Sequence, residues 1–275
     1  TFELLLAWTR EHLARPFDSL SAWLWAPNQP HRLRETNNAT DGDLAIAWAL
    51  QRGAARWGVE AWRQQAIAIS RDILTYCLRD VDGRCILLPG VSGFGKAGHV
   101  MVNPSYYMFP AIRALATLLP DSRWSRLQAD GEWLLANARF GRWGLPSDWV
   151  DMSRANGRLT PATDRPERFS WDAMRVPLFL VWGGLGAHPA VAAAADFWRE
   201  AQPGRLPVWV DLRSGALAPY AGHAGVAAVA ALARSVREER SFEMPLQTSA
   251  ADYYSGALIM LARMAQQESA INTKA

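Results

Sequence analysis

The sequence is poor in features that mark several common classes of protein. Its two cysteines, Cys77 and Cys85, allow one disulfide at most, and both could equally be free and buried. No apolar run approaches the ~20 residues of a membrane span. Lys and Arg lie scattered among acids, with a net charge of +3, so no nucleic-acid partner is expected. Half of the residues are apolar and a fifth are charged, the balance of a compact soluble protein.

Tryptophan is the residue in surplus. The chain has 14 Trp, against 9 Phe and 6 Tyr. Because the indole N–H needs a partner when it is buried, a surplus of Trp favours a stacking surface for flat ligands such as sugar rings. Large core residues between helices remain the plainer explanation for most of them.

The chain shows no linker, no shift in composition and no repeat of fixed period, so we expect a single domain over residues 1–275. It opens inside an amphipathic pattern, TFELLLAWTREHL, without Met and without a leader. We therefore expect a mature or trimmed fragment.

Helical periodicity dominates the sequence. Over 60–79, apolar residues at spacings of three and four form one stripe from Trp62 to Cys77, and 121–138 repeats the design after a cap at Asp121 or Ser122. Further helices are expected at 2–14, 43–57, 105–118, 172–183, 189–201, 222–237 and 251–266.

Two long loops, 88–107 and 141–170, separate some of these helices, and the second could form a small β-hairpin around Asn156 and Gly157. Helical hairpins joined by alternating short and long loops predict an α/α barrel whose long loops build a cleft. A plain helical bundle is the alternative, but it would not need loops of this length.

The stretch NNATDGDLAIAWAL, residues 37–50, places Asp41 and Asp43 where polar sequence turns into an apolar helix. Thr40 or Asp41 could cap that helix, with Asp43 in its first turn. Capping does not explain why five polar residues crowd here, so a role in binding substrate stays open. No calcium-loop pattern follows, and no metal site is predicted.

The stretch FSWDAMRVPLFLVWGG, residues 169–184, places Asp172 and Arg175 three apart, on one face of a starting helix. A carboxylate beside a guanidinium stays ionised, as a general base must. Trp171 could stack on a sugar. The alternative is a capping Asp with a local ion pair.

A third stretch, NPSYYMFPA, starts at residue 103. Pro104 and Ser105 are typical of a helix start, and Tyr106 and Tyr107 lie in its first turn. A phenol there could position a water or a sugar hydroxyl, and core packing is the default for at least one of the two.

These motifs resemble those of glycoside hydrolase family 8. ATDGDLAIAWAL, followed by Trp57, is close to the family signature, and SWDAMRVPLF, PSYY and ADYYSGALIML are supporting matches spread along the chain. More narrowly, the chain resembles the endo-β-1,4-glucanases encoded with bacterial cellulose synthases. Gln51, Gly53 and Trp171 depart from the family pattern, mildly.

The resemblance implies an (α/α)6 barrel that hydrolyses a β-1,4-glucan chain with inversion and needs no cofactor. In that chemistry, an acid and a base lie on opposite faces of the sugar. Asp172 would be the base, Asp41 would bind and distort the central sugar, and Tyr106 would help to hold the water. Arg175 would orient Asp172, and the weaker candidates for lining subsites are Trp25, Trp171 and Tyr254.

The family's general acid is a Glu in a Ser-Glu-Gly type segment on the first barrel helix, and no such segment occurs in this chain. Neither Glu3 nor Glu35 fits that role. We therefore expect a barrel that lacks its first helix, is poorly active, and exposes an apolar groove through which chains could associate or exchange helices. The resemblance also implies a periplasmic or secreted protein.

Other functions remain open at this stage. A non-catalytic glucan-binding protein would fit the Trp content and the missing acid. A polysaccharide lyase, or a related hydrolase of xylan or chitosan, would use the same scaffold, and a structural helical scaffold is the plainest alternative.

Overall fold

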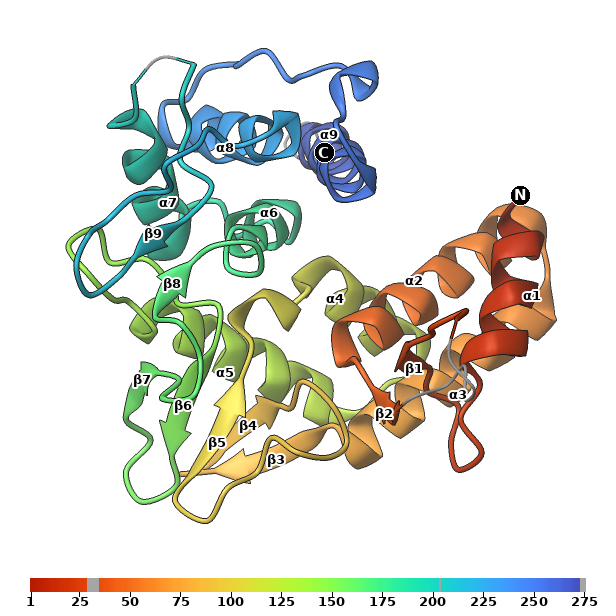
Figure 1. Ribbon diagram of the computed structural model, residues 1–275. Coiled ribbons are helices and arrows are strands. Elements are labelled where there is room, and N and C mark those ends of the chain that lie inside the picture. Colours follow the sequence, from red (N-terminus) through yellow and green to blue (C-terminus); the bar gives the residue numbers. More distant parts are fainter. Residues whose placement is uncertain (29–34, 203, 273–275) are drawn as a thin grey trace. The chain divides into compact units, whose positions relative to one another are not determined.

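The computed structural model describes residues 1–28, 35–202 and 204–272, and about half of them lie in helices (Figure 1). The chain forms two compact units. Unit 1 comprises Thr1–Val102, Ala111–Gly131 and Met152–Gly157, and unit 2 comprises Asn103–Pro110, Glu132–Asp151 and Arg158–Ala275.

Helices α1 (Phe2–Leu13), α2 (Thr40–Trp57) and α3 (Glu60–Tyr76) belong to unit 1. Gly58 links α2 to α3 with φ +71°, and its N–H donates to the carbonyl of Ala54 at 2.9 Å, a helix end that glycine adopts at no steric cost. The predicted stripe of α3 is confirmed, because Trp62, Ala66, Ile69 and Ile73 are all buried.

Short antiparallel pairs of strands accompany these helices. In unit 1, β1 (Ala22–Leu24) pairs with β2 (Glu35–Asn38), and β3 (Leu78–Val81) pairs with β4 (Arg84–Leu87). Asp82 and Gly83 join β3 to β4, both with positive φ, as a two-residue hairpin requires. Strand β5 spans His99–Val102.

The predicted hairpin around Asn156 and Gly157 is confirmed. Strands β6 (Val150–Ser153) and β7 (Leu159–Pro161) flank the turn. Gly157 has φ +63°, and its N–H donates to the carbonyl of Ser153 at 3.0 Å. A Cβ at Gly157 would meet the Asp82 carboxylate at 2.5 Å, so this turn admits only glycine without a shift.

A proline makes one helix begin later than the sequence predicts. The helix expected from 105 is instead a short 3-10 turn, η1 (Pro104–Tyr106), followed by α4 (Phe109–Leu118). A continuous helix would have placed Pro110 in its interior, without an N–H for the Tyr106 carbonyl. Helix α5 (Ser122–Asn137) follows as predicted, with the Asp121 carboxylate accepting the N–H of Arg123 at 2.8 Å.

Unit 2 is built around α6 (Arg175–Trp182), in which every residue from Val176 to Trp182 is buried. Its neighbours are α7 (Pro189–Arg199), α8 (Ala224–Arg237) and α9 (Tyr253–Asn272), with η2 (Gln247–Ser249) before α9 (Figure 1). Strands β8 (Arg168–Phe169) and β9 (Val210–Asp211) pair beside them. Gly225 lets α8 approach α9, because a Cβ there would lie 2.9 Å from the Ser255 backbone.

The cysteines and tryptophans settle two questions that the sequence left open. Cys77 and Cys85 are free and buried, so no disulfide forms. Trp62, Trp124, Trp182 and Trp198 are buried, whereas Trp8, Trp23, Trp57 and Trp171 are exposed. The core therefore accounts for part of the Trp surplus, and a set of indoles remains at the surface.

Candidate active site

Asp172 lies in the turn that precedes α6, not inside the helix as expected. The Val176 N–H donates to the Ala173 carbonyl at 3.0 Å in a tight turn, because Pro177 has no N–H that could donate to that carbonyl. The predicted ion pair is present: Nη2 of Arg175 donates to Oδ1 of Asp172 at 2.7 Å. The Asp172 side chain is 32% exposed, so water can reach it.

Asp148 holds this turn from the side. Its Oδ1 accepts the backbone N–H of Ser170 at 2.9 Å and that of Ala173 at 2.8 Å, and its Oδ2 accepts the Ser170 hydroxyl. Burial raises the pKa of Asp148 to about 6, against the opposing effect of these hydrogen bonds, and the negative charge of Asp172 adds to the rise. The donors that contact Asp148 belong to Ser170, two residues before Asp172, and to Ala173, one residue after it.

Tyr106 lies near Arg175, at the end of η1. The Arg175 guanidinium is 6.0 Å from the centre of the Tyr106 ring, and Trp149 meets the same ring edge-on at 6.3 Å. Tyr107 is fully buried and packs 6.5 Å from Phe109, so of the two tyrosines it is Tyr107 that belongs to the core.

An aromatic group adjoins Asp172. Trp171 is 40% exposed, stacks on His223 at 5.4 Å, and meets Tyr254 edge-on at 5.8 Å. The Tyr254 hydroxyl donates to the Trp171 carbonyl, and burial raises the pKa of Tyr254 to about 12. His223 caps α8 by accepting the Gly225 N–H at 3.1 Å, and burial lowers its pKa.

Unit 2 thus brings five of the sequence-predicted site residues into one neighbourhood. These five are Tyr106, Trp171, Asp172, Arg175 and Tyr254. The ion pair, the cation–π contact, the aromatic contacts and the phenol hydrogen bond described above join them. Asp148 and His223 were missed by sequence reasoning. A carboxylate beside Trp149 in a long loop was the available signal for Asp148; no pattern pointed to His223.

Asp41 and Trp25 belong to unit 1. Asp41 is half-buried in the first turn of α2, and its Oδ1 accepts the Gly42 N–H at 2.9 Å. The prediction of Thr40 or Asp41 as the helix cap is wrong. The N-cap is Ala39, and Thr40 is the first helical residue, because its N–H already donates to the Pro89 carbonyl at 2.9 Å.

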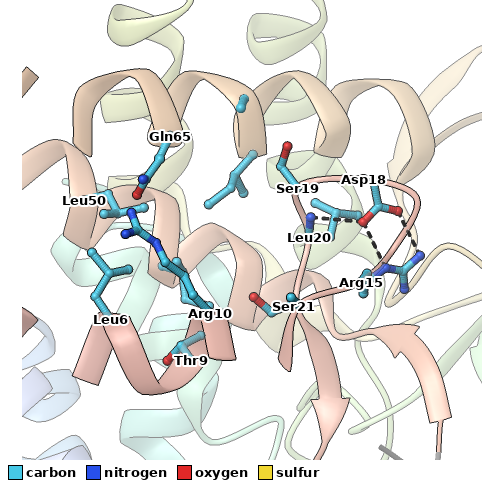
Figure 2. A pocket seen from close by; sticks show the side chains of 14 residues that line it. Leu6, Thr9, Arg10, Arg15, Asp18, Ser19, Leu20, Ser21, Leu50 and Gln65 are labelled. Carbon is cyan, nitrogen blue, oxygen red and sulfur yellow. Dashed lines mark hydrogen bonds and ion pairs between the residues drawn. The ribbon is translucent and has the colours of Figure 1, made fainter. Parts of the chain in front are cut away.

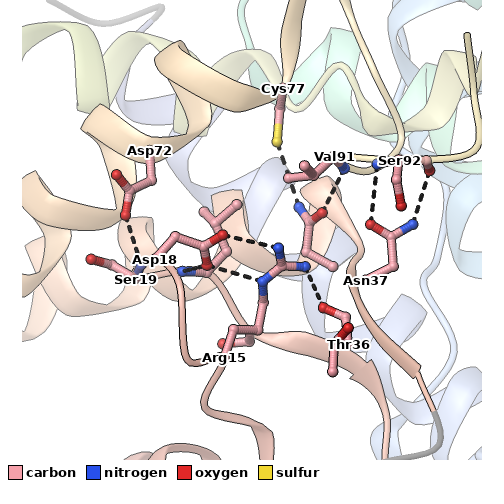
Figure 3. Close-up of polar contacts among 12 residues, drawn as sticks. Arg15, Asp18, Ser19, Thr36, Asn37, Asp72, Cys77, Val91 and Ser92 are labelled. Carbon is pink, nitrogen blue, oxygen red and sulfur yellow. Dashed lines mark hydrogen bonds and ion pairs between the residues drawn. The ribbon is translucent and has the colours of Figure 1, made fainter.

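Asp43 is almost completely buried and supports the start of α2. Its carboxylate accepts the Ser21 N–H at 2.7 Å and the Asn38 amide at 2.8 Å, while the Asn38 oxygen accepts the Val91 N–H at 2.8 Å. Burial raises the pKa of Asp43 to about 7. Figure 3 shows the neighbouring contacts, in which Arg15 binds Asp18.

Trp25 packs against α1. Its ring lies edge-on to Trp8 at 5.2 Å and to His12 at 5.4 Å. It is half-buried, so a part of the ring remains accessible.

Unit 1 also contains a pocket. It is lined by side chains from α1, α2, α3 and the segment after α1, including Leu6, Arg10, Leu50 and Gln65 (Figure 2). Its lining is mainly apolar, and none of the predicted site residues contributes to it.

Within residues 1–28, 35–202 and 204–272, no three His, Cys, Asp or Glu side chains gather in a way that could hold a metal ion. Over the same residues, no helix is both long and apolar enough to cross a membrane.

Comparison with known proteins agrees with the motifs. The family model "Glycosyl hydrolases family 8" matches residues 1–268. A probable endoglucanase of Novacetimonas hansenii is 37% identical over 271 residues, which are 98% of this chain and 78% of that protein. An endoglucanase of Cellulomonas uda is 38% identical over 220 residues, covering 80% of this chain.

The chain spans 60% of the length of the Cellulomonas relative. Among solved structures, an endo-β-1,4-glucanase from Acetobacter xylinum superposes with a TM-score of 0.92 at 37% identity, covering 98% of this chain and 83% of that one. The mostly helical fold is accordingly the (α/α)6 barrel type of these neighbours. On this agreement of motifs, sequence and fold, the chain belongs to glycosyl hydrolase family 8.

Proposed function

We propose that the protein hydrolyses internal bonds of a β-1,4-glucan such as cellulose, with inversion of configuration, and that Asp172 is the general base. The observation that carries this proposal is the arrangement of Asp172 and Arg175. Arg175 binds Oδ1 at 2.7 Å, and among the described residues none donates to Oδ2. That oxygen can therefore take a proton from water, as the base of an inverting glycosidase does.

The other residues have supporting roles in this proposal. Tyr106, beside Arg175, helps to hold the attacking water, and Arg175 fixes the orientation of the base. Asp41 binds the central sugar and favours its distortion towards the transition state. Trp171, which is partly exposed, and Tyr254 line subsites next to the base, and Trp25 lines a further subsite.

The proposal gives the general-acid role to none of the residues of this sequence, because the 275 residues contain no Ser-Glu-Gly segment. A protein without that acid should bind glucan but cleave it more slowly, by a factor of ~10² to 10⁴.

We further propose that the protein serves bacterial cellulose synthesis and acts in the periplasm or outside the cell. The resemblance of its motifs to glucanases encoded with cellulose synthases supports this proposal.

We also propose that chains associate with one another, by contact or by exchange of helices. Helix α1 exposes Leu4, Leu5 and Trp8, and this apolar surface supports the proposal. Light scattering that shows monomers alone at high concentration would contradict self-association.

The activity is tested by the release of reducing ends from carboxymethyl cellulose. We expect Asp172→Ala to lower kcat by ~10² to 10⁴ while the variant still binds glucan. Azide, a small nucleophile that needs no base, should restore activity to Asp172→Ala and yield a glycosyl azide. Asp164→Asn, which changes an exposed carboxylate in the same unit, is the matched control and should keep full activity.

The outcomes separate the alternative functions. If the full-length protein binds glucan and releases no reducing ends, it is a non-catalytic glucan-binding protein. Faster release from xylan or chitosan than from cellulose would assign it to a related hydrolase on the same scaffold.

A further inference from the structure

The turn that carries Asp172 is fastened to a second carboxylate, Asp148. Oδ1 of Asp148 accepts N–H groups from Ser170 and Ala173, which lie two residues before Asp172 and one residue after it. Oδ2 accepts the Ser170 hydroxyl. Asp172 therefore lies within a four-residue arc whose two ends are bound by one side chain.

The arc is also held at its base. The Asp148 N–H donates to the Arg168 carbonyl at 2.7 Å, and the Ser147 hydroxyl reaches the same carbonyl at 3.4 Å. Arg168 in turn pairs with Asp211 across β8 and β9. Because the backbone of Asp148 is anchored in this way, its side chain is a fixed point against which the turn is placed.

An ionised carboxylate is energetically unfavourable at this position. Burial and the negative charge of Asp172 both oppose ionisation of Asp148 and raise its pKa. An Asn oxygen could accept the same two N–H groups without that cost. Hydrogen bonds to a carboxylate are, however, shorter and stronger than those to a neutral amide, and so they restrain the turn more tightly.

The charged and titratable groups around Asp148 belong to the proposed catalytic site. Asp172 acts on Asp148 through its charge, and Asp148, Asp172 and Arg175 all act on the phenol of Tyr254. Few other contacts hold Asp172 itself, since its side chain bonds to Arg175 alone among the described residues.

We propose that Asp148 is a positioning residue for the hydrolysis, which acts by fixing the turn 170–173 so that the Asp172 carboxylate meets Arg175 and the attacking water. This inference rests on the proposed function of Asp172. A misplaced base costs rate but not substrate affinity, because the error falls on the reacting atoms. The effect of losing Asp148 should accordingly appear in kcat and depend on the presence of Asp172.

The test is a double-mutant cycle in the full-length protein, with Asp148→Ala and Asp172→Ala singly and together. Asp148→Ala should lower kcat by roughly ten- to a hundredfold, with KM changed by less than about threefold. In the Asp172→Ala background, the same change should lower the residual kcat by less than about twofold. Asp148→Asn, which keeps an acceptor for the two N–H groups, should recover a large part of the rate.

Asp130→Ala is the matched control. The Asp130 carboxylate belongs to unit 1, where it accepts the Cys85 N–H at 2.8 Å and binds Arg84, so it fastens a loop in the same manner. It should lower the melting temperature without changing kcat. The inference fails if Asp148→Ala keeps the wild-type kcat, or lowers kcat equally with and without Asp172.

A crystal structure of each variant gives a readout that does not depend on activity. We expect the bond between Arg175 Nη2 and Asp172 Oδ1 to be lost in Asp148→Ala and kept in Asp148→Asn. An unchanged bond in the alanine variant would overturn the inference even if the protein proved inactive. An inactive wild type with the expected displacement would instead refute the proposed hydrolysis and leave the structural role of Asp148 intact.

Discussion

At the scale of the residue, the pairing of Arg175 with Asp172 is the feature on which the chemistry depends. Arg175→Ala removes a charge-assisted bond worth about 1.5–3 kcal/mol, so kcat should fall by roughly ten- to a hundredfold. Arg199→Ala, which removes an exposed ion pair with Asp196, is the control and should leave kcat unchanged. Steady-state kinetics on a soluble cello-oligosaccharide measure both, and an unaltered kcat in Arg175→Ala would argue against the orienting role.

Replacing Tyr106 should mainly lower activity, whereas replacing its neighbour Tyr107 should mainly lower stability. Tyr107 is buried in the core, so Tyr107→Ala should lower the free energy of unfolding by about 3–5 kcal/mol. Tyr106 is only half-buried beside Arg175, so Tyr106→Ala should lower kcat with a smaller loss of stability. Urea unfolding and kinetics on the two variants measure the difference, and the reverse pattern would exclude Tyr106 from the site.

Sequence reasoning found the local pair and missed the distant partner. Asp172 and Arg175 are three residues apart, so their contact is local and could be expected from the sequence, although a turn and not a helix brings them together. Asp148 bonds to residues 22 and 25 positions away, and that approach depends on how two loops fold together. The cap of α2 was predicted wrongly for the same reason, since its first N–H is satisfied by Pro89, far along the chain.

At the scale of the element, helix α3 shows how far the apolar pattern determines stability. Ile73 is fully buried on the inner face, whereas Arg71, two residues earlier, is exposed. Ile73→Ala should lower the free energy of unfolding by about 2–5 kcal/mol, because a cavity replaces the lost methyl groups. Arg71→Ala should change it by less than about 0.5 kcal/mol. Equal effects of the two variants in urea unfolding would show that the assigned face is wrong.

Periodicity predicted every helix from α1 to α9. The largest error lies at the end of α9, which runs to Asn272 and not to 266, and prolines explain two of the errors at helix starts. Residues 105–108 and 172–174 carry the apolar pattern of a helix, yet Pro110 and Pro177 delay α4 and α6. The later helix starts can be predicted from the sequence, because proline lacks the N–H that the interior of a helix requires. That every residue of α6 after Arg175 is buried could not be predicted from the sequence, because this burial depends on the packing of α7, α8 and α9 together.

At the scale of the whole molecule, buried carboxylates make stability depend on pH. Burial raises the pKa of Asp43 from 3.8 to about 7 and that of Asp148 to about 6, so the folded chain holds these protons where the unfolded chain has lost them. Between about pH 4 and pH 7 the free energy of unfolding should therefore fall as pH rises, by at most about 1.4 kcal/mol per pH unit per group.

His223 acts in the opposite sense, since burial lowers its pKa. It is less buried than either acid, and we expect the acids to dominate. Thermal unfolding should give a higher melting temperature at pH 5 than at pH 7, and Asp43→Asn should flatten the slope. A melting temperature that rises steadily from pH 5 to pH 7 would contradict the raised pKa values of these two carboxyls.

The proposed hydrolysis depends on inversion at the anomeric carbon by a water that Asp172 activates. The most direct measurement is the proton NMR spectrum of the first products released by the full-length protein from a cello-oligosaccharide, recorded before mutarotation. Hydrolysis of a β-linkage with inversion predicts that the α-anomer appears first. Initial accumulation of the β-anomer would contradict the account, because the carboxylate would then be a nucleophile and not a base.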